Sequence, residues 1–95
     1  MKGLIPRTVW KYPFISHEPL SLQLPVGAIV RHVGVDPAGK GTLPCLWIEV
    51  GQRGLDERRS FDFFGTGHDV PETAAYIGTV IVPQGYVWHV YEVDL

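Results

Sequence analysis

Hydrophobic and polar residues alternate over short stretches of this chain, and glycine or proline interrupts each stretch before it grows long. Residues 20–24 (LSLQL) place three leucines on one side of an extended segment and Ser21 and Gln23 on the other. A period of two is typical of a β-strand with one buried face. Runs rich in β-branched and aromatic residues predict further strands, at residues 8–12, 28–35, 45–50, 59–64, 76–82 and 86–93.

The alternation also assigns faces within a predicted strand. In residues 28–35 it places Ile29, Val33 and Val35 on one side and Val30 and His32 on the other.

The segments between the predicted strands carry turn residues. Residues 36–41 (DPAGKG) have the composition of a long hairpin tip. In residues 82–85 (VPQG), Pro83 stands where a type I turn favours proline, and Gly85 stands where a three-residue hairpin needs a left-handed residue. We therefore expect the last two strands to form an antiparallel hairpin.

Glycine and proline are spread so evenly that an ordinary helix has no room. The chain has eleven glycines and eight prolines, and its longest stretches without either are residues 55–64 and 86–95. The mean helix has about 11–12 residues, and an interior proline costs about 3 kcal/mol. The sequence predicts a mainly β fold, a small antiparallel β-sandwich or barrel of six to seven strands with at most one short helix. The alternative is a mixed fold with that helix near residues 72–76, after Pro71.

Size and charge narrow the classes of protein. Ninety-five residues predict one domain, residues 1–95. A single cysteine excludes an internal disulfide, and a net charge of −2 argues against DNA binding by bulk charge. No apolar run approaches the roughly 18 residues of a membrane span, and the first residues lack the layout of a signal peptide. We expect a cytoplasmic protein without membrane contact.

Catalytic and metal-binding patterns are weak. The four histidines, at positions 17, 32, 68 and 89, have no partner at a usual metal-ligand spacing. Cys45 lies in an apolar strand, where a free cysteine is usually a small buried hydrophobe. Ser60 and Thr66 lack a nucleophile-elbow motif. The sequence predicts no enzyme, no metal site and no cofactor.

The segment Gly65-Thr66-Gly67-His68 is the most unusual local feature. Glycines let backbone N–H groups converge on an anion, and Thr66 and His68 can add side-chain donors. Arg58 and Arg59 lie upstream and could bring a guanidinium to the same rim. The alternative is a tight connection after a strand, in which the glycines serve only the turn.

The chain has more large aromatic residues than a core of this size can enclose. Some of them, Trp10, Trp47 or Trp88, could stack on a planar ligand, or the surplus could form a subunit interface. The interface is the favoured interpretation because small β-rich domains cover edge strands by associating. We therefore expect a homo-oligomer. The candidate ligand-binding residues are Arg58, Arg59, Thr66, Gly67, His68 and Trp88.

Several short motifs stand in a fixed order along the chain, at residues 9–13, 24–28, 32–35, 45–47, 57–59, 65–68, 76–80 and 87–92. In this order the chain resembles a family of short proteins of phages and prophage-bearing bacteria whose function is unknown. The similarity extends from Thr8 to Glu92, and the hairpin tip at residues 36–42 is richer in glycine than is typical of the family.

The resemblance implies a small phage protein that acts inside a bacterial cell, and it supplies no catalytic residues. Small phage proteins of one class sequester nucleotide immune signals of the host, so by analogy we expect a non-enzymatic counter-defence protein that binds a phosphate-containing nucleotide. The alternative is a protein-binding module that inhibits a host protein by surface contact, without a small-molecule ligand.

Overall fold

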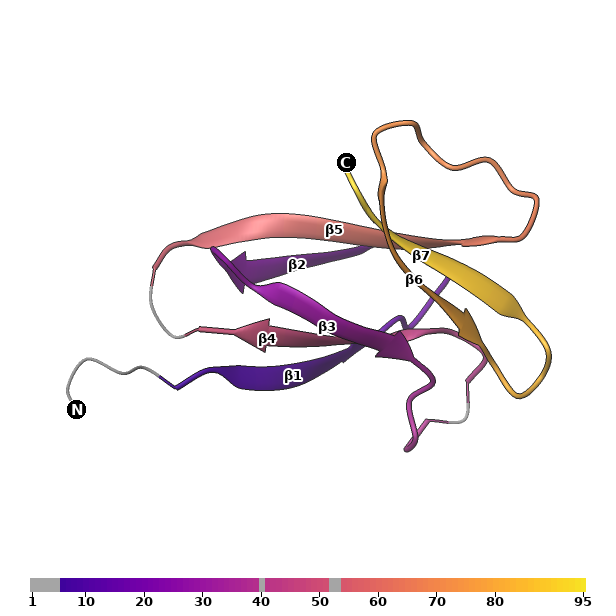
Figure 1. The fold of residues 1–95 in the computed structure, drawn as a ribbon, viewed down its shortest axis with the longest axis horizontal. Coiled ribbons are helices and arrows are strands. Elements are labelled where there is room, and N and C mark those ends of the chain that lie inside the picture. The colour runs from indigo at the N-terminus through magenta and orange to yellow at the C-terminus, as the bar shows by residue number, and fades with distance from the viewer. Residues whose placement is uncertain (1–5, 40, 52–53) are drawn as a thin grey trace.

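The alternating segments form two antiparallel sheets packed against each other (Figure 1), in a computed structural model that describes residues 6–39, 41–51 and 54–95. One sheet has three strands in the order β1-β4-β3, and the other has four in the order β2-β5-β7-β6. The sheets do not close into a barrel, which settles the sequence prediction in favour of a sandwich. The strands are β1 (Thr8–Pro13), β2 (Leu20–Pro25), β3 (Ile29–Gly34), β4 (Cys45–Val50), β5 (Asp56–Gly65), β6 (Ala75–Ile81) and β7 (Val87–Val93).

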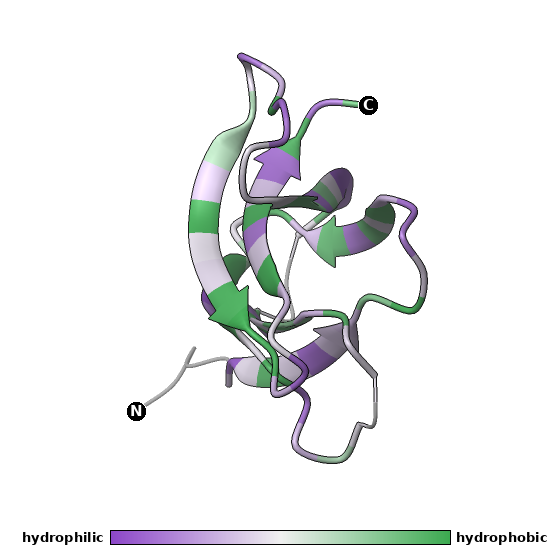
Figure 2. Ribbon diagram, turned by 90° about the vertical axis from the view of Figure 1, so that its right-hand side faces the viewer, coloured by the Kyte–Doolittle hydropathy of each residue, from purple (hydrophilic) through white to green (hydrophobic). Residues whose placement is uncertain are grey.

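The core lies between the inner faces of the two sheets. Directly opposed residues of antiparallel strands point to the same face, so one buried residue identifies the face of its partners. Leu46 and Ile48 of β4 have no exposed surface, and neither do Phe61 of β5 and Val90 of β7. Removing each such side chain from water contributes about 1.5–3 kcal/mol. Figure 2 shows the resulting stripes of apolar and polar residues along the strands.

The hairpin between β6 and β7 forms as the sequence predicts. The Gly85 N–H donates to the Val82 carbonyl at 2.8 Å, and Gly85 has a φ of +95°. The short helix considered near residues 72–76 does not form. In its place the Ala74 N–H donates to the Pro71 carbonyl in a single turn. No helix in the described ranges is long and apolar enough to cross a membrane.

The predicted faces of β3 are wrong because the strand contains a bulge. The register with β4 shifts between Val30 and His32, and the extra residue inverts the alternation beyond it. Val30 and Val33 therefore share the inner face, opposite Ile48 and Leu46, whereas Ile29 and His32 share the outer face.

The predicted start of β5 is also wrong. The sequence predicts the strand at residues 59–64, but it begins at Asp56, so the charged and exposed residues 56–58 are part of it. As a result, Arg59 is paired with Leu22 of β2 and shares its inward-facing register.

Cys45 is the buried hydrophobe that the sequence predicts. It has no exposed surface, and burial raises the pKa of its thiol to about 11. Near neutral pH the thiol is protonated and therefore a weak nucleophile.

Edge strands β3 and β6 hold the two sheets together along one side. They belong to different sheets but lie in direct contact. In this contact, a Cβ added to Gly78 would lie 2.5 Å from Cγ2 of Val33. Gly78 is thus the residue whose missing side chain lets the sheets meet.

We expect Gly78→Ala to lower the free energy of unfolding by about 1–3 kcal/mol, the usual cost of overpacking. Gly51→Ala is the matched control, because a Cβ there meets nothing within 4 Å. Urea denaturation of both variants measures the difference. In a double-mutant cycle, Val33→Ala should recover part of the loss. Equal effects of Gly78→Ala and Gly51→Ala would show that the contact does not limit the packing.

Candidate functional site

The two predicted arginines point to opposite faces of β5. Arg58 is exposed and opposes Gln23, whereas the Arg59 side chain is only 18% exposed. Arg59 donates from Nε and Nη2 to the two carboxylate oxygens of Glu92, both at 2.8 Å, and from Nη1 to the carbonyl of Ala28. The hydrogen bonds to Glu92 raise the pKa of Arg59. Arg59 is therefore already engaged by its own chain.

The Gly65-Thr66-Gly67-His68 segment forms a turn at the end of β5. The His68 N–H donates to the Gly65 carbonyl at 3.1 Å, and Gly67 has a φ of +89°. A Cβ on Gly65 would lie 3.1 Å from Cε1 of His68, so the imidazole lies directly over Gly65. The geometry of the turn thus explains both glycines. This agrees with the alternative interpretation of the sequence, in which the glycines serve only a tight connection after a strand.

The arginines and this turn do not meet. Thr66 lies seven positions after Arg59, just past the end of β5, which is roughly 23 Å along an extended chain at 3.3 Å per residue. The structure therefore does not bring Arg58, Arg59, Thr66, Gly67 and His68 together at one place. Ligand binding by any one of them stays a prediction.

Trp88 lies at one end of the core. Its register opposite Val80 and Gly65 places it on the inner face, and its Nε1–H donates to the Thr42 carbonyl at 2.6 Å. Its ring packs edge-on against Phe63, with 5.0 Å between centroids, and stacks on Tyr86 at 5.7 Å. Most of this indole is committed to packing.

Trp10 and Trp47 occupy opposite faces of the three-stranded sheet. Trp10 opposes the buried Ile48, yet it is 56% exposed because β1 is an edge strand. Trp47, on the central strand β4, faces outward and lies 5.4 Å from the His32 ring.

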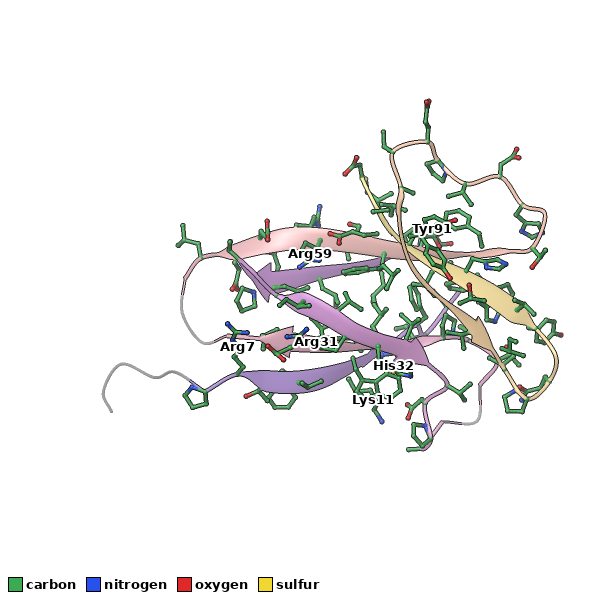
Figure 3. The ribbon with its side chains drawn as sticks, in the orientation of Figure 1. Arg7, Lys11, Arg31, His32, Arg59 and Tyr91 are labelled. Atoms are coloured by element: carbon green, nitrogen blue, oxygen red, sulfur yellow. The ribbon has the colours of Figure 1, made fainter. Side chains whose placement is uncertain are left out.

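Basic side chains surround Trp47 on the outer face of the three-stranded sheet. The register places Val9, Lys11, Ile29 and His32 on the same side as Trp47 and Glu49. Arg7 and Arg31 join this side through their contacts with Glu49. Figure 3 labels the four basic residues along the sheet. We call this surface the basic face, and it consists of Arg7, Val9, Lys11, Ile29, Arg31, His32, Trp47 and Glu49.

Two carboxylates hold the three permanent cations of the basic face. Arg7 and Arg31 both donate to Glu49, at 3.1 Å, and Lys11 donates to Asp36 at 2.9 Å. The hydrogen bonds from Arg31 and then Arg7 lower the pKa of Glu49, and that from Lys11 lowers the pKa of Asp36. The cationic side chains remain 66%, 49% and 40% exposed for Arg7, Arg31 and Lys11. They keep a surplus of positive charge beside an indole.

The outer face of the four-stranded sheet has a different chemistry. Phe64 of β5 and Tyr76 of β6 both pack edge-on against Tyr91 of β7, with centroids 5.6 and 5.4 Å away. Asp62 opposes Tyr91 on the other side. We call this surface the aromatic face, and it consists of Asp62, Phe64, Thr66, Tyr76, Thr79, His89 and Tyr91.

His89 is the centre of a hydrogen-bonded chain on the aromatic face. Its Nε2 lies 2.8 Å from Thr66 Oγ1, and its Nδ1 lies 3.0 Å from Thr79 Oγ1. Thr79 Oγ1 lies 2.6 Å from the Tyr76 hydroxyl. A neutral imidazole donates from one nitrogen and accepts at the other, so these contacts satisfy both. Of the predicted ligand-binding residues, Thr66 alone belongs to this chain.

Most residues of both faces could not be identified from the sequence alone. Alternation alone is enough to place His89 and Tyr91 on the same face, because they are two residues apart in β7. Arg31 was not recoverable in this way, since the bulge in β3 decides where it points.

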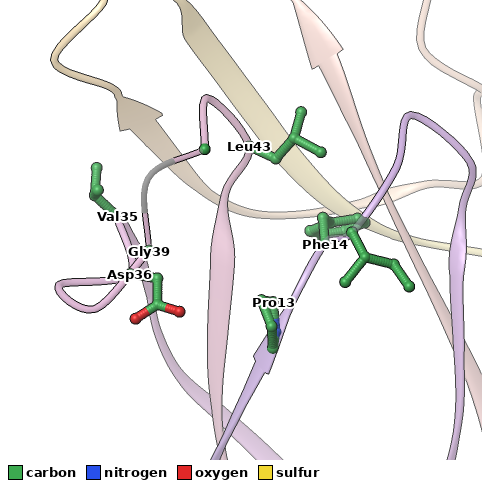
Figure 4. A pocket seen from close by; sticks show the side chains of 8 residues that line it. Pro13, Phe14, Val35, Asp36, Gly39 and Leu43 are labelled. Atoms are coloured by element: carbon green, nitrogen blue, oxygen red, sulfur yellow. The ribbon is translucent and has the colours of Figure 1, made fainter.

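The hollows of the described surface are shallow. One of about 180 Å³ lies beside the hairpin tip, and its walls are apolar apart from Asp36 (Figure 4). Another of about 390 Å³ lies over Arg59 and Glu92, between the starts of β3 and β6. Within the described residues, no three His, Cys, Asp or Glu side chains are grouped to hold a metal ion.

We expect Arg59→Ala to lower the free energy of unfolding by about 1.5–3 kcal/mol, the range for hydrogen bonds to charged groups. The variant leaves the partly buried Glu92 without its guanidinium. Arg58→Ala removes the same charge one residue away and should change stability by no more than about 0.5 kcal/mol. Guanidinium chloride denaturation compares them, and equal losses would contradict the structural role of Arg59.

We expect Gly67→Ala to cost about 1–2 kcal/mol of stability, because an L side chain disfavours the left-handed conformation. Gly67→Asn should cost less, since asparagine tolerates that region better. Thermal unfolding of the two variants measures the order. A loss that is larger for Asn than for Ala would rule out backbone conformation as the reason for this glycine.

Comparison with known proteins identifies the family. No curated protein and no solved structure matches the chain. A family model described as a domain of unknown function (DUF7352) matches residues 5–95. This match confirms the resemblance to an uncharacterised family, while the phage origin stays a prediction. Because the match covers nearly the whole chain, the protein belongs to the DUF7352 family.

Proposed function

We propose that this protein is a non-enzymatic binding protein whose basic face takes an anionic, base-containing ligand. The observation that carries the proposal is the Trp47 indole on an open sheet face, with Arg31 and Lys11 on either side of it. Stacking of a base on an aromatic side chain contributes about 1–3 kcal/mol. Guanidinium groups bind phosphate through two parallel hydrogen bonds. A nucleotide offers both partners at once.

The ion pairs support this use of the basic face. Glu49 lies between Arg7 and Arg31 and holds both guanidinium groups at its oxygens. Their geometry is therefore set before a ligand arrives, which reduces the entropy lost on binding. Their large exposed fractions leave N–H groups open to a phosphate.

Binding without turnover is part of the proposal. His32 is the titratable imidazole of the basic face, and among the described residues no hydroxyl or thiol is hydrogen-bonded to it. The bacterial host implied by the resemblance narrows the proposed ligand to a nucleotide-derived immune signal, sequestered as a counter-defence. A homo-oligomer remains part of the same proposal, and light scattering of the purified protein measures it.

A protein-binding module is the second candidate function. The aromatic face favours it, because an exposed tyrosine on an edge strand, here Tyr76 of β6, is typical of protein interfaces.

Calorimetric titration with a mononucleotide, a cyclic dinucleotide and ADP-ribose tests the first proposal. We expect at least one of them to bind, and Arg31→Ala to weaken it roughly tenfold or more, since a charged hydrogen bond is lost. Trp47→Leu should weaken the binding of a nucleotide but not the binding of inorganic phosphate.

Arg58→Ala is the matched control, because it removes another exposed arginine, on the other sheet. It should leave the affinity unchanged. Absence of binding by all three nucleotides at millimolar concentration would overturn the proposal. A loss in Arg58→Ala as large as in Arg31→Ala would reduce the interaction to bulk charge.

A further inference from the structure

The charges of the chain are divided unequally along its length. Residues 60–95 contain five carboxylates, Asp62, Asp69, Glu72, Glu92 and Asp94, and no lysine or arginine. This part of the chain supplies most of β5 and all of β6 and β7, so it supplies the whole aromatic face. The aromatic face therefore contains one carboxylate and no lysine or arginine, in contrast to the basic face.

Asp62 is the carboxylate that lies on the aromatic face itself. Its Oδ1 accepts the Phe63 N–H at 2.8 Å, and no salt bridge to it is found within the described residues. Burial raises the pKa of Asp62, and the charge of Glu18 raises it further. Both effects disfavour the ionised form of Asp62, and a cation beside the carboxylate would favour that form.

One tyrosine lies opposite this carboxylate, and a second lies one strand further along the same face. Tyr91 opposes Asp62 on β5 and Tyr76 on β6, and Figure 3 shows Tyr91 on the opposite sheet from the labelled residues of the basic face. Tyr76 is 59% exposed, so a ligand can reach the ring. The face of a tyrosine ring attracts cations, and a guanidinium or ammonium group fits a site made of rings and a carboxylate.

We propose that the aromatic face binds an arginine or lysine side chain of a protein partner, with the cation against the exposed Tyr76 ring and the Asp62 carboxylate supplying the negative charge of the same face. Charge complementarity selects this occupant. A nucleic acid or a nucleotide would be repelled by Asp62 and Glu18, whereas a basic segment is attracted by both. The site is independent of the basic face and gives a partner chemistry to the protein-binding function.

Titration of the full chain with the peptide GRGRGRGR, followed by calorimetry, tests the proposal. The same peptide with citrulline in place of arginine is the neutral control, because citrulline keeps the shape and loses the charge. We expect the arginine peptide to bind, the citrulline peptide to bind at least fivefold more weakly, and added salt to weaken the arginine peptide.

Asp62→Asn and Tyr76→Ala should each lower the affinity for the arginine peptide roughly fivefold. Asp94→Asn, an exposed carboxylate of the same acidic half, is the matched control and should have no effect. Tyr76→Ala removes an exposed ring, so it keeps the test valid if Asp62→Asn does not fold. Arg31→Ala should leave this binding unchanged, which separates the result from the nucleotide proposal.

Three outcomes would overturn the inference. Equal effects of Asp62→Asn and Asp94→Asn would mean that only net charge attracts the peptide. Equal affinity for the citrulline peptide would mean that the cation is not recognised. Self-association of the protein that Asp62→Asn abolishes would identify the occupant as a second copy of this chain.

Discussion

Burial of apolar side chains between the two sheets is the interaction on which the rest of this structure depends. Leu46 and Ile48 from one sheet and Phe61 and Val90 from the other are fully removed from water. Because successive residues of a strand point to opposite faces, burying these side chains also determines what faces solvent. Both outer faces are thus consequences of the core.

Charged residues in the inward register conflict with this arrangement, and Arg59 is the one that belonged to the first candidate site. Strand β5 continues past the apolar core, so its inward register includes Arg59. A charge in a partly buried position needs a partner, and Glu92 and the Ala28 carbonyl provide it. The arginine with the strongest hydrogen bonds is therefore the one least free to bind a ligand.

The two outer faces differ because the chain distributes its charges unevenly between the sheets. The three exposed cations around Trp47 come from the first 31 residues. Arg7 directly precedes β1, Lys11 lies on β1 and Arg31 lies on β3. The strands beyond residue 60 carry tyrosines, hydroxyls and carboxylates instead. One molecule thus presents a positive aromatic surface and a negative one, and opposite classes of ligand suit them. Because the hollows of the described surface are shallow, these faces are where the proposed binding would take place.

The sequence by itself determined the β class, the approximate positions of the seven strands and the hairpin at residues 82–86, because these follow from local alternation and turn chemistry. It also identified Cys45 as a buried hydrophobe. The contacts of Arg59 with Glu92 and of Thr66 with His89 were decided only by tertiary structure, since they join residues 33 and 23 positions apart. The bulge in β3 belongs to the same class. Which residue is extra depends on pairing with β4, and the bulge lets the adjacent residues Arg31 and His32 share the outer face beside Trp47. Local patterns specify which faces a strand can have, whereas long-range pairing specifies which residues occupy them.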